Sequence, residues 1–480
     1  MRNGSLDGGE NVDPRRQPIS AATRLFDPAG VPDIAVQGFL IIESGMNLST
    51  RSWTRMRRHF IVAIALLLGT WACSQTSSSQ TAVVPPAPAT CAASGGDFAI
   101  HVCGNRLVDG TGRTVQLRGV SISGLETVAI MGWAPDDPWG GQSPNFSALK
   151  SWGINALRIP LNEASWRGGT CVDGSGFGST VMGGSKSQNR PGAVVKSDPG
   201  ANYRTTLASA VAKATTERMY VILDLHLTAP GNACPMAQNA MADADHSVAF
   251  WSSIASEYKR YPNVIFELFN EPFLDQTSLQ DNMPWVDLIK GDGTLSSYIT
   301  QGNPSIIDYT WKNAGMQQML NAIRAAGASN VILTSTLAYS SSMGGWLKYH
   351  PTDTLNPSQV AAVWHAYPND KDPSLVNCIG SPSDCSAKTM SAAQAILSAG
   401  FPVVITEFGD AVGGSSAPLS SVVLPFADAN GMSYLAWTWD AWPSPKFVLI
   451  RDTAGTPTAG FGTYVKAHYQ CRAAGTAECP

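Results

Sequence analysis

The chain has 480 residues, of which 44% are hydrophobic and 14% are charged, and its formal net charge is −4. This length and hydrophobic content permit one large domain with a sizeable buried core. The slightly acidic balance lacks the basic surface of a nucleic-acid-binding protein, so a neutral polymer or a small neutral molecule is the partner that fits.

The N-terminal part carries the pattern of an export signal. Arg55, Arg57 and Arg58 precede an apolar stretch at 60–68, which is followed by small residues and Cys73. This order is typical of a secretory signal, and the apolar stretch is too short for a permanent membrane span. We expect four segments: an unstructured or over-extended N-terminus at 1–54, the signal at 55–73, a Ser/Pro-rich tether at 74–95 and one folded domain at 96–480.

Cysteine usage supports export. Without Cys73, eight of the nine cysteines remain, an even number that suits disulfides in an oxidising compartment. We expect the pairs 91–103, 171–234, 378–385 and 471–479. Cys73 resembles the acylated cysteine of bacterial lipoproteins, although residues 70–72 depart from the usual Leu-rich box, and simple cleavage after Ala72 is the alternative. The expected product is secreted, periplasmic or an outer-membrane lipoprotein of a bacterium, with membrane contact only through a lipid on Cys73.

From Phe98 onward, strand and helix patterns alternate. A short hairpin comes first, with turns predicted at Gly104-Asn105 and at 109–112. Eight strands are then predicted at 115–121, 155–160, 220–225, 264–270, 330–335, 361–366, 402–406 and 433–439. Amphipathic helices are predicted between most of them, for example at 203–218, 247–260, 309–326 and 391–398. The pattern predicts the α/β class, as a (β/α)8 TIM barrel with a short N-terminal hairpin.

The long connections follow strands rather than helices. Residues 162–202 follow the second strand, 273–305 the fourth and 368–389 the sixth. In a parallel barrel these loops rise at the C-terminal mouth, where substrates bind. Four loop tryptophans are expected to be exposed along a groove with several subsites: Trp133, Trp139, Trp166 and Trp285.

Two glutamates stand where buried strands leave the sheet. Glu271 follows the apolar run 264–269, and Glu407 follows the run 402–406. Runs of Val, Ile and Phe without polar alternation are typical of parallel strands covered on both faces, so a carboxylate fits only at the exit. Two carboxylates facing each other across a barrel mouth are the minimum equipment for hydrolysing a glycosidic bond.

Other polar and aromatic residues are also predicted at strand ends: Arg158, His226, Asn270, His365, Tyr367, Trp437 and Trp439. Each alone could be structural, but their convergence on one face indicates a site. Glu267 is expected one layer deeper, as a buried partner of Arg158, whereas Glu126 and Glu163 could touch substrate. The histidines lack metal-ligand spacing and the glycine runs lack phosphate-loop spacing, so neither a metal nor another cofactor is expected.

The motifs resemble those of glycoside hydrolase family 5, the cellulase-like branch of the (β/α)8 glycosidases. They are Leu157-Arg158-Ile159-Pro160, Asp224-Leu225-His226, Phe269-Asn270-Glu271-Pro272, His365-Ala366-Tyr367, Thr406-Glu407-Phe408-Gly409 and Ala436-Trp437-Thr438-Trp439. The resemblance implies that Glu271 is the acid/base and Glu407 the nucleophile. It also implies a supporting, substrate-binding shell of Arg158, His226, Asn270, His365, Tyr367 and Trp437, with Trp439 as a further face for a sugar ring.

By this resemblance, the domain at 96–480 is the catalytic barrel of a monomeric, retaining endo-β-1,4-glucanase, a cellulase. Its partner would be β-glucan or a related plant polysaccharide, cleaved by double displacement. The same chemistry on mannan, xyloglucan, mixed-linkage glucan or β-1,3-glucan stays open, as does an exo-acting β-glucosidase-type enzyme, because loops choose the substrate. The alternative from another class is a carbohydrate-binding barrel, which would not need both acids.

Overall fold

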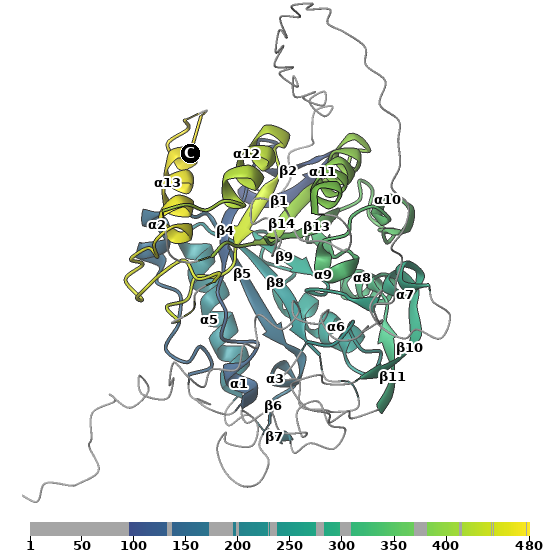
Figure 1. The fold of residues 1–480 in the computed structure, drawn as a ribbon. Coiled ribbons are helices and arrows are strands. Elements are labelled where there is room, and N and C mark those ends of the chain that lie inside the picture. Colours follow the sequence, from purple (N-terminus) through teal and green to yellow (C-terminus); the bar gives the residue numbers. More distant parts are fainter. Residues whose placement is uncertain are drawn as a thin grey trace, which may run out of the picture. The chain divides into compact units, whose positions relative to one another are not determined.

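A computed structural model of the chain describes residues 96–131, 137–171, 195–197, 201–228, 230, 238–274, 283–297, 309–368, 382–411, 415–442, 444, 446–476 and 478–480. Within them, eight parallel strands form a closed barrel, which confirms the predicted fold class (Figure 1). The strands are β4 (Arg118–Ser121), β5 (Ala156–Asn162), β8 (Tyr220–Leu227), β9 (Val264–Glu267), β12 (Ile332–Thr334), β13 (Val360–Ala366), β14 (Val403–Phe408) and β15 (Ser433–Ala436). Strand β15 pairs with β4 and closes the barrel.

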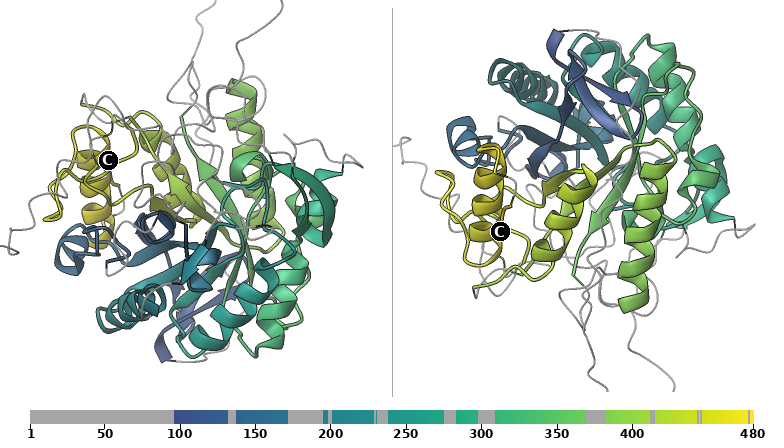
Figure 2. Two further views of the ribbon diagram at one scale, coloured as in Figure 1. Left: turned by 90° about the horizontal axis from the view of Figure 1, so that it is seen from below. Right: turned by 90° about the horizontal axis from the view of Figure 1, so that it is seen from above.

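Helices surround the barrel (Figure 2). The longer ones are α5 (Asn202–Thr216), α6 (Ser247–Tyr258), α8 (Met316–Ala325), α11 (Pro382–Ser398), α12 (Ser420–Asn430) and α13 (Phe461–Ala473). The shorter ones are α1 (Val128–Met131), α2 (Phe146–Ser151), α3 (Glu163–Trp166), α7 (Pro284–Lys290), α9 (Leu337–Ser340) and α10 (Trp346–Tyr349). Among the residues that the structure describes, none of these helices is long and apolar enough to cross a membrane.

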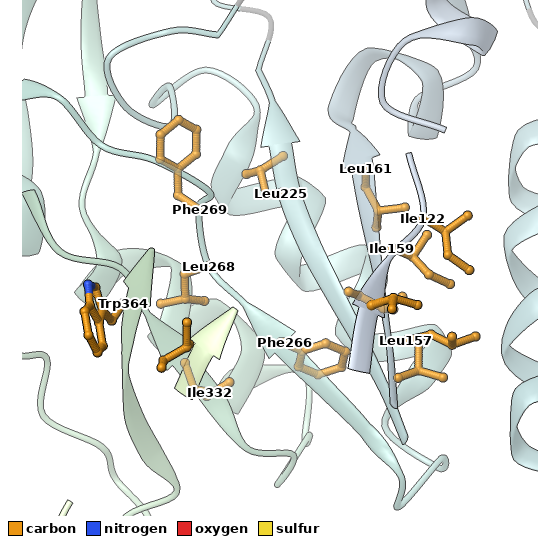
Figure 3. Packing of buried hydrophobic residues seen from close by; sticks show 14 of the residues in the cluster. Ile122, Leu157, Ile159, Leu161, Leu225, Phe266, Leu268, Phe269, Ile332 and Trp364 are labelled. Atoms are coloured by element: carbon orange, nitrogen blue, oxygen red, sulfur yellow. The ribbon is translucent and has the colours of Figure 1, made fainter. Parts of the chain in front are cut away.

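The first residues of most barrel strands are apolar because both faces of each strand are buried there. On β5, Leu157, Ile159 and Leu161 belong to the cluster between strands and helices (Figure 3), whereas Ala156 belongs to a second cluster inside the barrel. The inner cluster takes alternate residues from the strands or from the position just before them: Leu117, Ala156, Tyr220, Ile222, Ile265, Val331, Leu333, Ala361, Val363, Val404 and Leu435. This alternation between two apolar environments explains the continuous apolar runs in the sequence.

The predicted hairpin covers the end of the barrel at which the strands begin. Strands β1 (Gly96–Cys103) and β2 (Arg106–Gly110) pair antiparallel, and β3 (Thr114–Val115) adds a third strand. The Val102 N–H donates to Gln359 Oε1 at 2.8 Å and the Ile100 N–H donates to Pro262 O at 2.9 Å, just before β13 and β9 respectively. Ile100, Val102 and Leu107 continue the apolar cluster inside the barrel, which places the hairpin across its N-terminal end (Figure 2, right).

Three predicted elements differ most from the structure, and the strands predicted at 264–270 and 433–439 end earlier, at Glu267 and Ala436. The strand expected at 115–121 is divided between hairpin strand β3 and barrel strand β4. The helix expected at 309–326 begins as strand β11 (Tyr309–Ala314), which pairs with β10 (Gly291–Ser297), and only then becomes α8. Tyr, Thr and Trp favour a strand, and pairing with the preceding loop outweighs the helical period of this segment. Helix α11 starts at Pro382 rather than at Ser391.

The loop that follows β5 contains a further antiparallel pair of strands, β6 (Gly169–Cys171) with β7 (Val195–Ser197).

One of the four predicted disulfides lies entirely within the described residues, and it is formed: Cys471–Cys479. Cys103 is also disulfide-bonded, but its predicted partner Cys91 lies outside the described residues. The predicted pairs 171–234 and 378–385 include Cys234 and Cys378, which lie outside them as well, as do the predicted signal and tether.

Candidate active site

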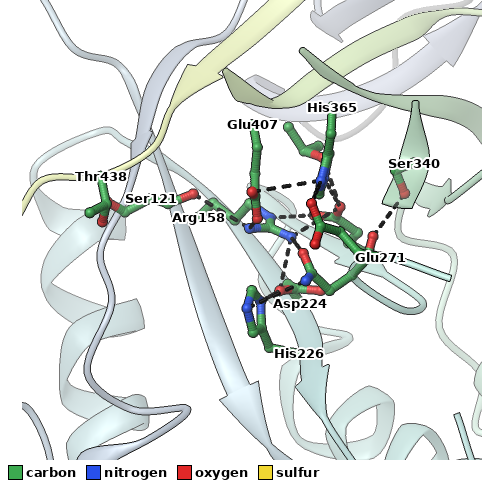
Figure 4. A network of polar contacts seen from close by, with 12 residues as sticks. Ser121, Arg158, Asp224, His226, Glu271, Ser340, His365, Glu407 and Thr438 are labelled. Atoms are coloured by element: carbon green, nitrogen blue, oxygen red, sulfur yellow. Dashed lines mark hydrogen bonds and ion pairs between the residues drawn. The ribbon is translucent and has the colours of Figure 1, made fainter. Parts of the chain in front are cut away.

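Two residues beyond the inner apolar cluster, towards the C-terminal ends of the strands, the inward-facing side chains are polar. These residues are Arg158 on β5, Asp224 on β8, Glu267 on β9, His365 on β13 and Thr406 on β14, and all are buried. They contact one another inside the barrel (Figure 4). The catalytic mouth of a barrel is built at this end of the strands, so the cluster forms the floor of the candidate site.

Arg158 is the centre of the cluster. Its Nε lies 2.7 Å from Glu267 Oε2, its Nη2 2.9 Å from Asp224 Oδ2 and its Nη1 2.5 Å from Glu407 Oε1. The predicted pairing with Glu267 is therefore present. The predicted placement at a strand end is wrong, because β5 continues to Asn162 and the guanidinium is fully buried. Arg158 holds the carboxylates from beneath and offers no exposed atom to a ligand.

Glu407 has the surroundings of an ionised carboxylate. Its Oε1 accepts from Arg158, its Oε2 accepts from the Tyr367 hydroxyl at 2.6 Å, and His365 Nδ1 lies 3.6 Å from Oε2. Burial alone would raise the pKa of Glu407, but the charges of His365 and Arg158 outweigh it and hold the pKa below its usual value. Gly409 permits this arrangement, because a Cβ there would lie only 3.1 Å from the Tyr367 ring.

Glu271 occupies a more open position, four residues beyond the end of β9. Its side chain is 17% exposed, against 5% for Glu407. Its Oε1 lies 2.9 Å from His365 Nδ1. One oxygen of each glutamate and a ring nitrogen of His365 all lie within 4.8 Å of one another. A partly exposed carboxyl beside a buried, ionised one is placed to exchange a proton with a bound ligand.

A β-bulge places two consecutive residues of β14 inside the barrel. In the pairing with β13, Thr406 is the extra residue opposite the step from Trp364 to His365. A bulge re-aims the side chains that follow it, so Thr406 and Glu407 both contact the cluster. The Thr406 hydroxyl donates to Glu267 Oε1 at 2.8 Å and lies 3.0 Å from His365 Nε2. Alternation from Val404 already turns Thr406 inward, but the predicted strand ended at Thr406 and only Glu407 beyond it was singled out.

The second histidine lies on the other side of Arg158. His226 Nδ1 is 2.7 Å from Asp224 Oδ2, and its ring stacks on Trp437 with centroids 5.5 Å apart at 10°. Asn270 accepts from Arg158 Nη2 at 2.8 Å, and its Nδ2 lies 3.4 Å from His226 Nε2. Burial raises the pKa of Asp224 to about 6, although Arg158 opposes the rise. The structure thus brings His226, Asn270 and Trp437 together beside the glutamates.

Several tryptophans expected at the mouth are core residues instead. Trp439 is 3% exposed and packs edge-on against Trp152, with ring centroids 4.8 Å apart. Because β15 ends at Ala436, the two-residue alternation that would align Trp439 with Trp437 does not extend that far. Trp139 and Trp166 are also buried, and Trp285 is half-buried. Trp133 lies outside the described residues.

The other acids singled out by sequence are bonded to the protein. The Ser123 hydroxyl donates to Glu126, while the Ser123 N–H donates at 3.2 Å to Asp440, a buried acid that sequence reasoning missed. Burial raises the pKa of both Glu126 and Asp440. Glu163 accepts from the Ser247 hydroxyl at 2.8 Å. These contacts give all three acids structural partners.

Two groups of described residues bring possible metal ligands within 4.8 Å of one another. One is the set Glu271, His365 and Glu407, whose atoms already bond one another and Arg158. The other is Asp243, Asp245 and His246 at the start of α6, where Asp243 Oδ1 accepts the backbone N–H of His246 at 2.8 Å. Both sets therefore have hydrogen-bonding roles within the protein.

The chain is similar in sequence and fold to known glycoside hydrolases. The family model for cellulase, glycosyl hydrolase family 5, matches residues 108–442. An endoglucanase of Clostridium saccharobutylicum is 21% identical over 84% of this chain and 68% of its own length. Endoglucanase A of Butyrivibrio fibrisolvens is 29% identical, but the match spans 37% of this chain and 33% of that protein. A β-glucanase of Saccharophagus degradans, solved with cellotetraose, has a TM-score of 0.50 at 18% identity, covers 81% of this chain and 98% of its own, and shows the same fold.

Proposed function

Because the chain belongs to the cellulase family, glycosyl hydrolase family 5, we propose that it is a retaining endo-β-1,4-glucanase with Glu407 as nucleophile and Glu271 as acid/base.

The spacing of the two carboxylates carries this proposal. Their nearest oxygens lie within 4.8 Å of each other. A retaining glycosidase needs carboxyl groups about 5–5.5 Å apart, whereas an inverting one needs roughly 6.5–9.5 Å to admit a water molecule. The narrow spacing favours direct attack by a carboxylate on the sugar.

The surroundings of each glutamate favour one role. Glu407 is kept ionised by Arg158 and accepts from Tyr367, so it is suited to attack the anomeric carbon. Glu271 is more exposed and gives its proton to the departing glycosidic oxygen. Esterification removes the negative charge of Glu407. Glu271, now a carboxylate, then takes a proton from water, whose oxygen attacks the same carbon and releases Glu407.

Two aromatic surfaces near the glutamates favour a substrate of several sugars. Trp437 stacks on His226, and Phe273, two residues after Glu271, stacks on Tyr339 with centroids 4.9 Å apart. The Tyr339 N–H donates to Pro272 O at 2.9 Å, which fixes this second surface beside the acid/base. Aromatic faces provide large, rigid apolar area for sugar rings. Two separate surfaces suit internal cleavage of a chain better than removal of a terminal sugar.

The names of the relatives favour glucan as the substrate, since both sequence relatives are endoglucanases and the solved β-glucanase holds cellotetraose. Mannan, xyloglucan, mixed-linkage glucan and β-1,3-glucan are the alternatives, because the same two glutamates would act on each. We also propose that the enzyme acts outside the cytoplasm, secreted or anchored through Cys73, because the sequence at 55–73 has the pattern of an export signal. It is proposed to act as a monomer.

Reducing-sugar release on carboxymethyl cellulose, barley β-glucan, xyloglucan and mannan tests the proposal, with the Glu407→Gln variant as the inactive control. We expect the highest rate on carboxymethyl cellulose, with a rapid fall in viscosity. Preferential hydrolysis of mannan or xyloglucan would contradict the substrate, and sugar release without a viscosity change would contradict the endo mode. Wild-type turnover no higher than that of the control on every polymer would contradict an enzymatic role.

A further inference from the structure

We infer that Thr406 is a positioning residue of this active site: its hydroxyl accepts the Nε2 proton of His365, so that Nδ1 is the ring atom that shares a titrating proton with Glu271. The inference rests on the proposed function, because it concerns how the acid/base is supplied with a proton. It follows from the hydrogen-bonding capacity of four buried or partly buried groups.

The first step concerns Glu267, which can only accept hydrogen bonds. Arg158 Nε lies 2.7 Å from its Oε2. Burial would raise the pKa of Glu267, but Arg158 and His365 together lower it to about 2, so the carboxylate is ionised. An ionised carboxylate has no proton to donate. The 2.8 Å hydrogen bond from Thr406 Oγ1 to Glu267 Oε1 therefore uses the single hydroxyl proton of Thr406.

The second step concerns His365 Nε2, which lies 3.0 Å from Thr406 Oγ1. Since the threonine proton is already committed, this contact is a hydrogen bond only if Nε2 donates. Glu267 Oε1 is 3.8 Å from Nε2, too far for a hydrogen bond of its own. His365 is buried, so water does not replace Thr406. The proton of neutral His365 therefore resides on Nε2.

The third step concerns Nδ1, which then faces Glu271 Oε1 at 2.9 Å with a lone pair. A lone pair opposite a carboxylate is repulsive, so one proton is held between the two atoms. The ionisable groups facing His365 are Glu267 and Glu271 at and beyond the end of β9, and Glu407 on β14. Burial lowers the pKa of His365, but these carboxylates raise it to about 10, so the pair retains its proton through neutral pH.

The bulge in β14 is an independent observation that supports this role. In a regular strand, neighbouring side chains point to opposite faces, so Thr406 and Glu407 could not both reach the barrel interior. The extra residue in the pairing with β13 removes that restriction. Alternation from Val404 sets the Thr406 hydroxyl beneath His365, and the bulge lets Glu407 reach the same interior.

Two substitutions test the inference, one that keeps the shape of the side chain and one that keeps its hydroxyl. Thr406→Val removes the hydroxyl, and Thr406→Ser keeps it. In the Val variant, neutral His365 can move its proton to Nδ1 and donate to ionised Glu271, so the pair loses its shared proton at lower pH. We expect the alkaline limb of kcat/KM on a cello-oligosaccharide to fall by about one pH unit, since one hydrogen bond changes a pKa by on the order of one unit. The Ser variant should retain the wild-type profile.

A substrate comparison separates proton supply from general damage. On the cello-oligosaccharide, kcat/KM of Thr406→Val should fall roughly tenfold or more, because a poor leaving group needs the acid. On 2,4-dinitrophenyl β-cellobioside, which needs little protonation, the change should stay below about threefold. Equal losses on both substrates, or overlapping profiles for the Val and Ser variants, would overturn the inference while leaving the proposed function intact. A wild-type enzyme inactive on both substrates would overturn the two together.

Nitrogen-15 NMR of the histidines in the wild-type protein gives a readout that needs no folded Val variant. The signals of His365 are assigned by their loss in His365→Gln. We expect Nε2 to carry a proton at every pH, with any titration confined to Nδ1. A neutral His365 with its proton on Nδ1 would overturn the inference directly.

Discussion

The two ends of the barrel interior differ in almost every physical respect, although the same strands build both. Where the strands begin, the inward residues are apolar and the hairpin covers them. The next inward residues, two positions further along each strand, are ionisable: Ile222 is followed by Asp224 on β8, and Val363 by His365 on β13. The comparison teaches that in this chain stability and chemistry occupy separate layers, in line with the general division between the two faces of such barrels.

The polar layer is not arranged for stability. One guanidinium, that of Arg158, contacts three buried carboxylates, Asp224, Glu267 and Glu407. Desolvation of buried charges offsets much of their mutual attraction, so such a cluster contributes less to folding than an apolar core of the same volume. The cluster is explained by what it does to Glu407, whose ionisation it secures.

Substitution of Glu407 should give the largest loss of activity and should leave the stability of the fold intact. We expect Glu407→Gln to lower kcat roughly 10³-fold or more, since the covalent route is lost, while the midpoint of thermal unfolding stays the same or rises. The matched control is Glu217→Gln, a surface glutamate bonded to Lys150 and Lys213, which should leave kcat unchanged. Full turnover by Glu407→Gln, or a collapse of its stability, would contradict the separation of layers.

Substitution of Glu271, the proposed acid/base, should give a smaller loss that depends on the substrate. In Glu271→Ala, hydrolysis of the polymer should fall by roughly 10²–10⁴-fold, the usual contribution of general acid–base catalysis. An aryl glycoside with a good leaving group should be cleaved with little loss in the first step, and azide should accelerate release from the enzyme. Equal losses on both substrates without azide rescue would assign Glu271 a different role.

The opposite pattern is expected at the hairpin end. Leu107 is buried in the inner apolar cluster, and Leu107→Ala should lower the free energy of unfolding by about 2–5 kcal/mol while kcat of the folded enzyme is unchanged. Leu347→Ala is the control, since that side chain is 40% exposed and should cost little. Denaturant unfolding and active-site titration together check this, and a kcat loss in Leu107→Ala would show that the two layers are coupled.

A pH effect of smaller size is expected from Asp440. Burial raises its pKa well above the usual value, so the folded state holds this proton to higher pH than the unfolded state does. Its contribution to stability is therefore present at low pH and declines as pH rises above the unfolded pKa. Asp440→Asn, which resembles the protonated acid, should unfold about 2–4 °C higher than wild type at pH 7.

The same difference should shrink towards pH 4, where the unfolded carboxyl also becomes protonated. Calorimetry of both proteins at the two pH values makes the comparison. A stability difference that does not change with pH would show that Asp440 is ionised in the folded protein.

Much of this arrangement was predictable from sequence because it follows from strand periodicity. Apolar runs without alternation located the barrel strands, and the glutamates and His365 fell at or just beyond their ends. The resemblance to known glycosidases then grouped these residues into one site. Glu267 was predicted as the partner of Arg158 from its spacing to Glu271, and the structure confirms the contact.

The remainder depends on features that leave no trace in a one-dimensional pattern. A bulge changes side-chain direction without changing composition, so the joint inward placement of Thr406 and Glu407 was hidden. Depth along a strand is equally invisible, which is why Arg158 was expected to reach the surface and is buried instead. Trp439 was misplaced because strand alternation was extended past the end of β15. Pairing with a distant loop, as in β11, overrode a local helical period.

The stereochemistry of the first product tests most directly the claim that Glu407 and Glu271 act by double displacement. Proton NMR during hydrolysis of a cello-oligosaccharide resolves the anomeric signals before mutarotation mixes them. Two successive inversions at the same carbon predict that the β anomer forms first and the α anomer grows in later. An initial α product would mean a single displacement by water and would contradict the assignment of Glu407 as nucleophile.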